Sequence, residues 1–206
     1  MIYLSDDYVT KYSDVISYLL SRSYSEGYSF DFIQKNISYS KMMFELEKSN
    51  VTTIAFSSME KIYYEIFPVR TNDFIFDEYG PFGWVGLMYV HLFLKKQLTL
   101  EAIFYVIPIE QMLHLYHLYH EMSLTEIDDY FDDILKYSIL DIVMKNQKIS
   151  NTDLSKKTGI SSATIKALRY GRRNINKLES EKLLFIAQAL NIKMETLLTS
   201  IHLQCA

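Results

Sequence analysis

Residues 149–174 carry the pattern that decides the fold of the last third of the chain, and they read ISNTDLSKKTGISSATIKALRYGRRN. Gly159 stands between two short helical patterns, where a left-handed backbone favours a residue without a Cβ atom. The second pattern follows a serine that can cap a helix, and its buried face would be Ile165 and Leu168. Gly171 then ends it. The sequence therefore predicts two short helices joined by a tight turn.

This segment resembles the Cro/CI-type (XRE family) helix-turn-helix. The positions that carry the likeness are Ser150, Asn151, Leu154, Ser155, Gly159, Ile160, Ser161, Ile165 and Gly171. Residues 178–198 are similar to the fourth and fifth helices of that family. Two positions depart from the family pattern, because Asn151 stands where Gln is usual and Arg169 where Glu is frequent. The resemblance implies a lambda-repressor-like DNA-binding domain of five helices over residues 133–206.

The resemblance also implies that the second helix docks in the major groove of double-stranded DNA. The residues at its outward positions, which would read base edges, are Ser162, Ala163, Lys166 and Ala167. The remaining DNA-binding candidates, most of them suited to phosphates, are Asn151, Thr152, Ser161, Thr164, Arg169, Tyr170, Arg172 and Arg173. Since two reading positions are alanines, we expect DNA shape to carry part of any specificity.

Charge is divided unevenly along the chain. Residues 133–206 hold 12 Lys/Arg and 6 Asp/Glu, whereas residues 1–132 hold 9 Lys/Arg and 19 Asp/Glu. A basic region suits a nucleic acid, because affinity comes largely from neutralising phosphates. An acidic region would repel DNA and more readily faces protein, ligand or solvent. We therefore predict two domains, 1–132 and 133–206, with a tight junction and no flexible linker. A helix-turn-helix that binds protein instead of DNA is the alternative.

The first 132 residues show helical patterns and resemble no family. Fifteen of the 17 tyrosines lie there, which favours an aromatic core, part of which could line a partner surface. Residues 21–29 read as a loop. Two short apolar runs, Val51–Phe56 and Lys61–Phe67, predict a small two-stranded β ribbon. The pattern over Leu124–Lys145 is compatible with one continuous helix that enters the DNA-binding domain. The predicted fold class is mainly α with this one small β element.

Three histidines in the N-terminal part raise the question of a metal site. His114, His117 and His120 recur at helical spacing and precede Glu121, and imidazoles with a carboxylate can bind zinc. The three drift by about 120° around a helix, however, and no remote ligand is identifiable. A solvated polar face is the favoured interpretation, and no metal or other cofactor is predicted. Because glycine-rich phosphate loops and nucleophile elbows are also missing, we predict no enzymatic activity.

Location follows from a few simple features. The lone Cys205 cannot form an internal disulfide, which suggests a reducing compartment. Neither a signal peptide nor a long uncharged apolar stretch is visible. We expect a cytoplasmic protein without a membrane partner.

Two functions are compatible with these observations. The first is a sequence-specific transcription regulator, a repressor, that binds DNA as a homodimer because one recognition helix contacts too few base pairs. Its dimer interface would come from the acidic part or from residues 194–203. The second is an antitoxin or phage-related neutralising protein, which would bind a protein partner through the acidic part and autoregulate through the helix-turn-helix. A third, a metal-dependent enzyme, would need the three histidines.

Overall fold

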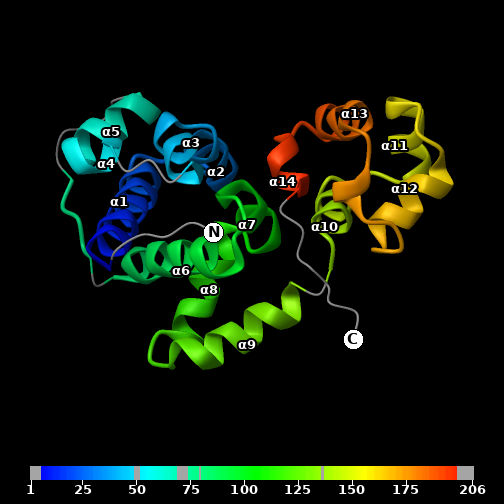
Figure 1. Cartoon of the computed structure of the whole chain (residues 1–206). Helices are drawn as coiled ribbons and strands as arrows, with labels where there is room; N and C mark the ends of the chain where they lie inside the picture. Colours follow the sequence, from blue (N-terminus) through cyan, green and yellow to red (C-terminus); the bar gives the residue numbers. More distant parts are fainter. Residues whose placement is uncertain (1–5, 49–51, 69–73, 79, 136, 199–206) are drawn as a thin grey trace. The chain divides into compact units, whose positions relative to one another are not determined.

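The computed structural model describes residues 6–48, 52–68, 74–78, 80–135 and 137–198, and its regular structure is helical (Figure 1). The helices are α1 (Asp6–Ser25), α2 (Phe30–Ser38), α3 (Lys41–Glu47), α4 (Thr52–Phe56), α5 (Met59–Ile66), α6 (Pro81–Lys96), α7 (Leu100–Val106), α8 (Ile109–Tyr119), α9 (Leu124–Ile134), α10 (Ile139–Asn146), α11 (Asn151–Thr158), α12 (Ser162–Arg169), the 3-10 helix η1 (Ile175–Lys177), α13 (Ser180–Leu190) and α14 (Met194–Leu198). Chain contacts divide the protein into two compact units, Met1–Met122 and Ser123–Ala206, which we call the N-terminal and C-terminal units. None of the helices in the described ranges combines the length and apolarity needed to span a membrane.

The predicted β ribbon is wrong. Its two segments form α4 and α5 instead, and the described residues contain no strand. Ser58 starts α5 by accepting a hydrogen bond from the backbone N–H of Lys61 at 3.2 Å. Ile62 and Tyr63 then enter the core. A serine cap and tertiary packing thus outweigh the strand preference of β-branched and aromatic residues. Val51, at the start of the first segment, lies outside the described residues.

Serine and threonine side chains set the start of most helices. In each case the hydroxyl accepts the backbone N–H three positions along, and so satisfies one of the donors that a helix start leaves unpaired. These capping residues are Ser29, Ser40, Ser58, Thr99, Ser123, Ser138, Ser150 and Ser161. The many caps explain why the chain folds into short helices.

The continuous helix expected over residues 124–145 is interrupted, because Ser138 begins a new one. Its hydroxyl accepts the backbone N–H of Asp141 at 3.1 Å and donates to the carbonyl oxygen of Arg169 at 2.6 Å. The second bond reaches 31 residues along the chain. The helix therefore breaks where α10 must join the end of α12.

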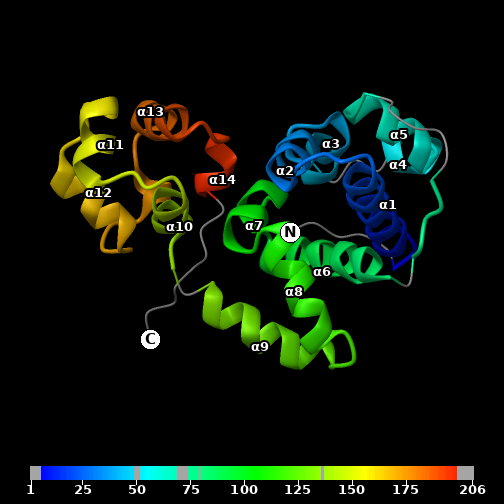
Figure 2. The same cartoon turned by 180° about the vertical axis from the view of Figure 1, so that it is seen from behind.

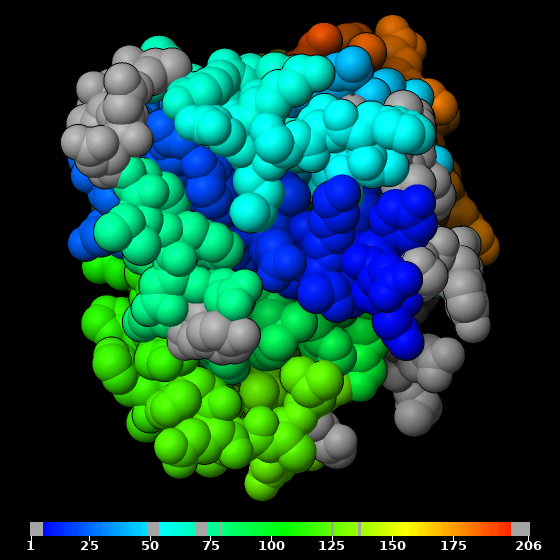
Figure 3. Space-filling model, turned by 90° about the vertical axis from the view of Figure 1, so that its left-hand side faces the viewer, coloured from blue at the N-terminus to red at the C-terminus, as the bar shows by residue number. Residues whose placement is uncertain are grey.

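Close packing of α1 against α6 organises the N-terminal unit. Figure 1 shows the two helices side by side, and Figure 3 shows α1 (blue) between α4–α5 (cyan) and α6 (green). The hydroxyl of Ser17 donates to the carbonyl oxygen of Gly83 across this contact at 3.2 Å. A Cβ atom on Gly86 would lie 2.1 Å from the Ser17 hydroxyl oxygen and 2.8 Å from the Ser13 carbonyl oxygen. Only glycine permits this approach.

A buried arginine extends α1 into the loop that was predicted over residues 21–29, so the loop begins later than expected. Arg22 is only 2% exposed and pairs with Glu26 at 3.2 Å. Its guanidinium also donates to the Tyr18 hydroxyl at 2.6 Å and lies 4.5 Å from the centre of the Tyr63 ring. The carboxylate, hydroxyl and π-face together compensate the lost hydration of the cation.

In the C-terminal unit, helices α10 to α14 enclose a core of their own. Figure 2 shows α11 and α12 adjacent, with α13 and α14 following them along the chain. The core residues from these helices and their turns include Leu140, Val143, Met144, Leu154, Ile160, Ile165, Leu168, Leu183, Ile186, Leu190 and Leu197. The predicted five-helix arrangement is thus observed in α10 to α14.

Replacing Gly86 by alanine is expected to destabilise the N-terminal unit, although alanine is the better helix former by about 1 kcal/mol. The new Cβ would lie 2.7 Å from the backbone nitrogen of Ser17, so the two helices would have to separate. We expect a net loss of about 1–3 kcal/mol in the free energy of unfolding, measured in urea by circular dichroism. The half-exposed neighbour gives the control, because Leu87→Ala should cost less than about 1 kcal/mol. A Gly86→Ala variant as stable as the parent would contradict this packing.

Candidate DNA interface

The first helix of the motif, α11, starts at a reciprocal cap. The Ser150 hydroxyl accepts the backbone N–H of Asp153 at 3.1 Å, and the Asp153 carboxylate accepts the backbone N–H of Ser150 at 3.3 Å. Hydrogen bonds from the Ser150 side chain and then from its backbone lower the pKa of Asp153, because they favour its ionised form. The cap places two predicted DNA contacts in the first turn, the half-buried Asn151 and the exposed Thr152.

The turn between the two motif helices has the predicted left-handed residue. Gly159 adopts φ 71° and donates its N–H to the Ser155 carbonyl at 2.9 Å. A Cβ here would meet no atom within 4 Å, so the backbone angle and not space favours glycine. The Thr158 hydroxyl, which donates to the Leu154 carbonyl at 2.7 Å, accepts the N–H of Ile160 at 3.3 Å. These bonds set the direction in which α12 leaves the turn.

Helix α12 has the buried face and the outward face that the pattern predicted. Its cap Ser161 accepts the backbone N–H of Thr164 at 3.2 Å, and the two hydroxyls are 2.9 Å apart. Ile165 and Leu168 are buried against the core. Among the predicted reading positions, Ala163 and Lys166 are exposed, whereas Ser162 and Ala167 are half-buried. The outward face therefore offers one long cationic side chain among small ones.

Two exposed arginines follow the end of α12. Gly171 ends the helix at φ 69° and donates its N–H to the Leu168 carbonyl at 3.2 Å. The N–H of Arg173 then donates to the Ala167 carbonyl at 3.1 Å, which turns the chain back over the helix end. Arg172 and Arg173 are exposed, and so is the ring of Tyr170. These three lie where the docking geometry of the family would bring phosphates.

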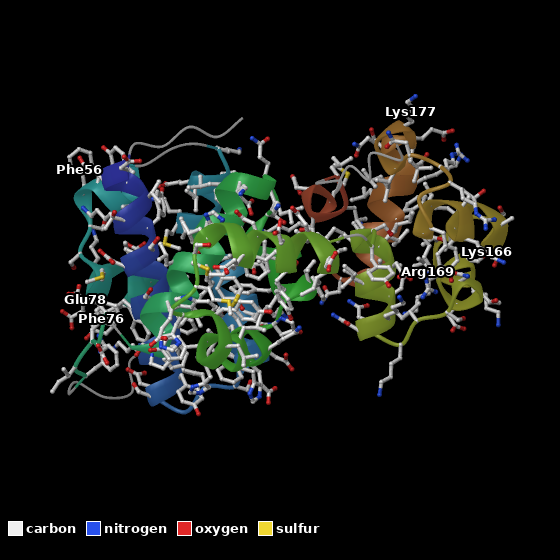
Figure 4. The ribbon with its side chains drawn as sticks, turned by 90° about the horizontal axis from the view of Figure 1, so that it is seen from below. Phe56, Phe76, Glu78, Lys166, Arg169 and Lys177 are labelled. Atoms are coloured by element: carbon white, nitrogen blue, oxygen red, sulfur yellow. The ribbon has the colours of Figure 1, made fainter. Side chains whose placement is uncertain are left out.

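Arg169 is turned inward, unlike the exposed Lys166, Arg172 and Arg173. Its side chain is 13% exposed, and its Nε donates to the Asp141 carboxylate at 2.6 Å. Its Nη1 donates to the side-chain oxygen of Asn151 at 3.2 Å. Figure 4 shows Arg169 on the side of α12 nearer α10 and Lys166 on the outer side. The structure thus brings two predicted DNA contacts, Asn151 and Arg169, into contact with each other.

Asp141, which was not among the residues predicted from the sequence, joins this cluster to α10. Its carboxylate is almost fully buried and also accepts from the ammonium of Lys145 at 2.7 Å. Burial acts to raise its pKa, but hydrogen bonds from Lys145 and Arg169 outweigh burial and lower the pKa. The available signal was an acidic residue in the first turn of an otherwise apolar helix, together with an arginine where the family pattern frequently has Glu.

A second group of polar residues that the sequence did not single out follows the two arginines. The Asn174 side-chain oxygen accepts the N–H of Asn176 at 2.9 Å and starts η1, from which Lys177 projects into solvent (Figure 4). Their position a few residues after the end of α12 was the feature of the sequence that could have identified them. Lys177 is thus a further exposed cation that follows α12 along the chain.

The histidines of α8 make local contacts. His120 stacks on Tyr116 with ring centres 4.5 Å apart, and its Nδ1 lies 2.7 Å from the Tyr116 carbonyl oxygen. In the described ranges, no three His, Cys, Asp or Glu side chains gather in a way that could hold a metal ion. The spacing of His114, His117 and His120 is therefore not matched by a ligand cluster there.

Comparison with known proteins agrees with this geometry. Residues 140–202, from α10 to just beyond α14, match the family model of the Cro/C1-type HTH DNA-binding domain. No curated protein and no solved structure matches the chain. The C-terminal third therefore carries a Cro/C1-type helix-turn-helix DNA-binding domain, as the sequence predicted.

Replacing Asp153 by asparagine is expected to lower the melting temperature at neutral pH, because a neutral amide interacts less favourably with a helix start. The pKa of Asp153 is depressed in the folded protein, so its contribution is complete above the ordinary value of 3.8 and is lost as the pH falls through the lower, folded value. The difference between variant and parent should therefore shrink in acid. Thermal unfolding of the full chain over a pH series measures it. Asp129→Asn, at an exposed site on α9 that caps no helix, is the control. A difference that stays constant into acid would contradict the role of ionised Asp153.

Proposed function

We propose that the protein is a sequence-specific transcription regulator that represses by occupying its DNA site. The DNA-binding domain indicates a regulator. The observation that carries the proposal is the exposed basic surface formed by Lys166 on α12 and by Arg172 and Arg173 after it. In a helix-turn-helix, these positions lie over the major groove and its flanking phosphates. Repression needs only occupancy, so it requires no additional activating surface.

Contacts to the DNA would divide into two kinds. Lys166 would reach the acceptor pair of a guanine, and Ala163 would touch a thymine methyl group. Arg172, Arg173 and the capping hydroxyl of Ser161 would bind phosphates, which orient the domain without reading sequence. Because the reading face is small, DNA shape would supply part of the specificity.

The regulator would act as a homodimer on two half-sites about 10 base pairs apart. One recognition helix contacts too few base pairs for useful selectivity, which a second copy corrects. An apolar surface on α13, where Leu184 and Phe185 are both exposed, supports self-association of the C-terminal unit. The N-terminal unit and residues 194–203 are the other candidate interfaces, and residues 199–203 lie outside the described ranges.

A salt-dependent titration against duplex DNA from upstream of the protein's own gene, and against scrambled DNA, tests DNA binding. Lys166→Ala should weaken binding to the upstream DNA roughly tenfold and should affect scrambled DNA less. Arg172→Ala should weaken binding to both and reduce the slope of log K against log salt by about 0.9. Lys41→Ala is the control, since this exposed lysine lies in the N-terminal unit, and it should change neither affinity. A chain that binds neither DNA at moderate salt is no DNA-binding regulator.

We also propose that the acidic N-terminal unit binds a protein partner, as an antitoxin or neutralising protein would. Phe56 on α4 is 84% exposed and projects from the surface, as Figure 4 shows, and Ile75 is 93% exposed. Large exposed apolar side chains in an acidic region favour a partner that combines apolar and basic groups. A small basic protein encoded beside this gene would have that chemistry.

Phe56→Ser should weaken binding of such a neighbouring basic protein at least tenfold, measured by calorimetry, because an exposed aromatic anchor is lost. The fold should be unaffected, since the side chain makes few internal contacts. Leu118→Ser replaces an exposed apolar residue on α8 and should bind the partner as the parent does. Equal affinities for parent and Phe56→Ser, or a gene without such a neighbour, would count against this second function.

A further inference from the structure

We infer that Arg169 is a positioning residue, which orients the side-chain amide of Asn151 so that its NH₂ group donates to a DNA phosphate. The inference rests on the proposed DNA binding and concerns how one contact is built. It begins from the 3.2 Å hydrogen bond that Arg169 Nη1 donates to Asn151 Oδ1.

A guanidinium can donate hydrogen bonds but cannot accept them. The Asn151 amide must therefore turn its oxygen toward Arg169. Because the amide group is planar, its NH₂ group then points away from Arg169. An amide nitrogen can donate to a phosphate, whereas an amide oxygen would repel it. Without Arg169 the two orientations would be close in energy, since the shapes of the two branches are nearly the same. Arg169 selects the productive one.

Arg169 is itself poorly placed to reach a phosphate. It is 13% exposed, and its Nε lies 2.6 Å from the Asp141 carboxylate, which is 3% exposed. Moving the guanidinium to the DNA would leave that buried carboxylate with Lys145 as its cation, and breaking a buried ion pair is costly. The direct phosphate contact that the sequence suggested for Arg169 is therefore less favourable than an indirect role.

Both departures of this sequence from the family pattern meet at this contact. Asn151 is one methylene shorter than the usual Gln, and Arg169 is longer than the frequent Glu, so the pair still spans the space between α11 and α12. A glutamate at position 169 could only accept hydrogen bonds and would turn the amide the other way. The two departures are therefore chemically compatible with each other, since Arg169 donates and the Asn151 oxygen accepts.

The hydrogen bonds of Arg169 to Asn151 and Asp141 together link three helices. Asp141 lies on α10, Asn151 on α11 and Arg169 on α12. Because Arg169 holds both of the others, the phosphate donor on α11 keeps a fixed position relative to the reading face of α12. Such support of a contact residue by a second residue is what precise docking requires.

A double-mutant cycle in the full-length protein tests the inference. Asn151→Ala, Arg169→Met and the double variant are titrated with the upstream duplex, at a temperature where circular dichroism shows each to be folded. Arg169→Met lowers stability because a buried ion pair is lost, but Lys145 still pairs with Asp141, so the carboxylate keeps one cation. Asn151→Ala should weaken binding roughly tenfold, because the phosphate donor is lost. Arg169→Met should weaken it about twofold, because only about half of the Asn151 amides would then present the NH₂ group. The double variant should bind no more weakly than Asn151→Ala.

Lys145→Met is the matched control. It removes the same charge from the same carboxylate but, unlike Arg169, Lys145 has no hydrogen bond to Asn151 in the structure. Its effect on DNA affinity should be smaller than that of Arg169→Met and should add to that of Asn151→Ala. This separates positioning of the amide from a general loss of positive charge.

The side-chain NH₂ resonances of Asn151 give a readout that a merely structural role of Arg169 would not move. They should shift when DNA binds the parent and shift less when DNA binds Arg169→Met. Additive losses in the cycle would overturn the inference, because Arg169 would then act on DNA by itself. Parent-like affinity of Arg169→Met would also overturn it. In both cases the parent still binds DNA, whereas a parent that binds no duplex refutes the proposed function and the inference together.

Discussion

The buried carboxylate of Asp141 is the constraint on which the DNA-binding unit depends. A charge removed from water must be paired, and here Arg169 at 2.6 Å and Lys145 at 2.7 Å supply its partners. The Ser138 hydroxyl holds the backbone of the same arginine. The end of α12 is thus tied to α10 through both its side chain and its main chain. These bonds hold the inner side of α12, so its outward face remains exposed to solvent and available to DNA.

The N-terminal unit depends on a different constraint, the close approach of α1 and α6. The missing side chain of Gly86 lets the helix backbones meet, and the Ser17 hydroxyl bridges them with a hydrogen bond to the Gly83 carbonyl oxygen. Next to this contact, Arg22 lies buried among tyrosines and Glu26. Both units therefore bury an arginine with a carboxylate, but only in the C-terminal unit does the arginine also touch a residue of the candidate interface.

The helix-turn-helix was predictable because its signals are local. The left-handed Gly159 and the Ser161 cap act within four residues of the chain, so spacing alone locates them. The prediction of a β ribbon was wrong because it rested on apolar runs and overlooked a local cap. Short apolar runs do not distinguish a strand from a buried helix, and the deciding signal was Ser58, a cap between the two runs. Ser138 likewise marked the break in the expected long helix.

The sequence by itself determined where the C-terminal helices begin and end and which faces they bury, since caps, left-handed glycines and helical periodicity all involve neighbouring residues. It also determined the family of this domain. Only the tertiary structure decided which of the predicted contacts faces outward. Arg169 meets Asp141 across 28 residues and Asn151 across 18, and such pairings depend on how helices pack and not on local spacing. A positive charge near a recognition helix suggests a phosphate contact, but a buried carboxylate within reach competes for it, and burial strengthens that attraction.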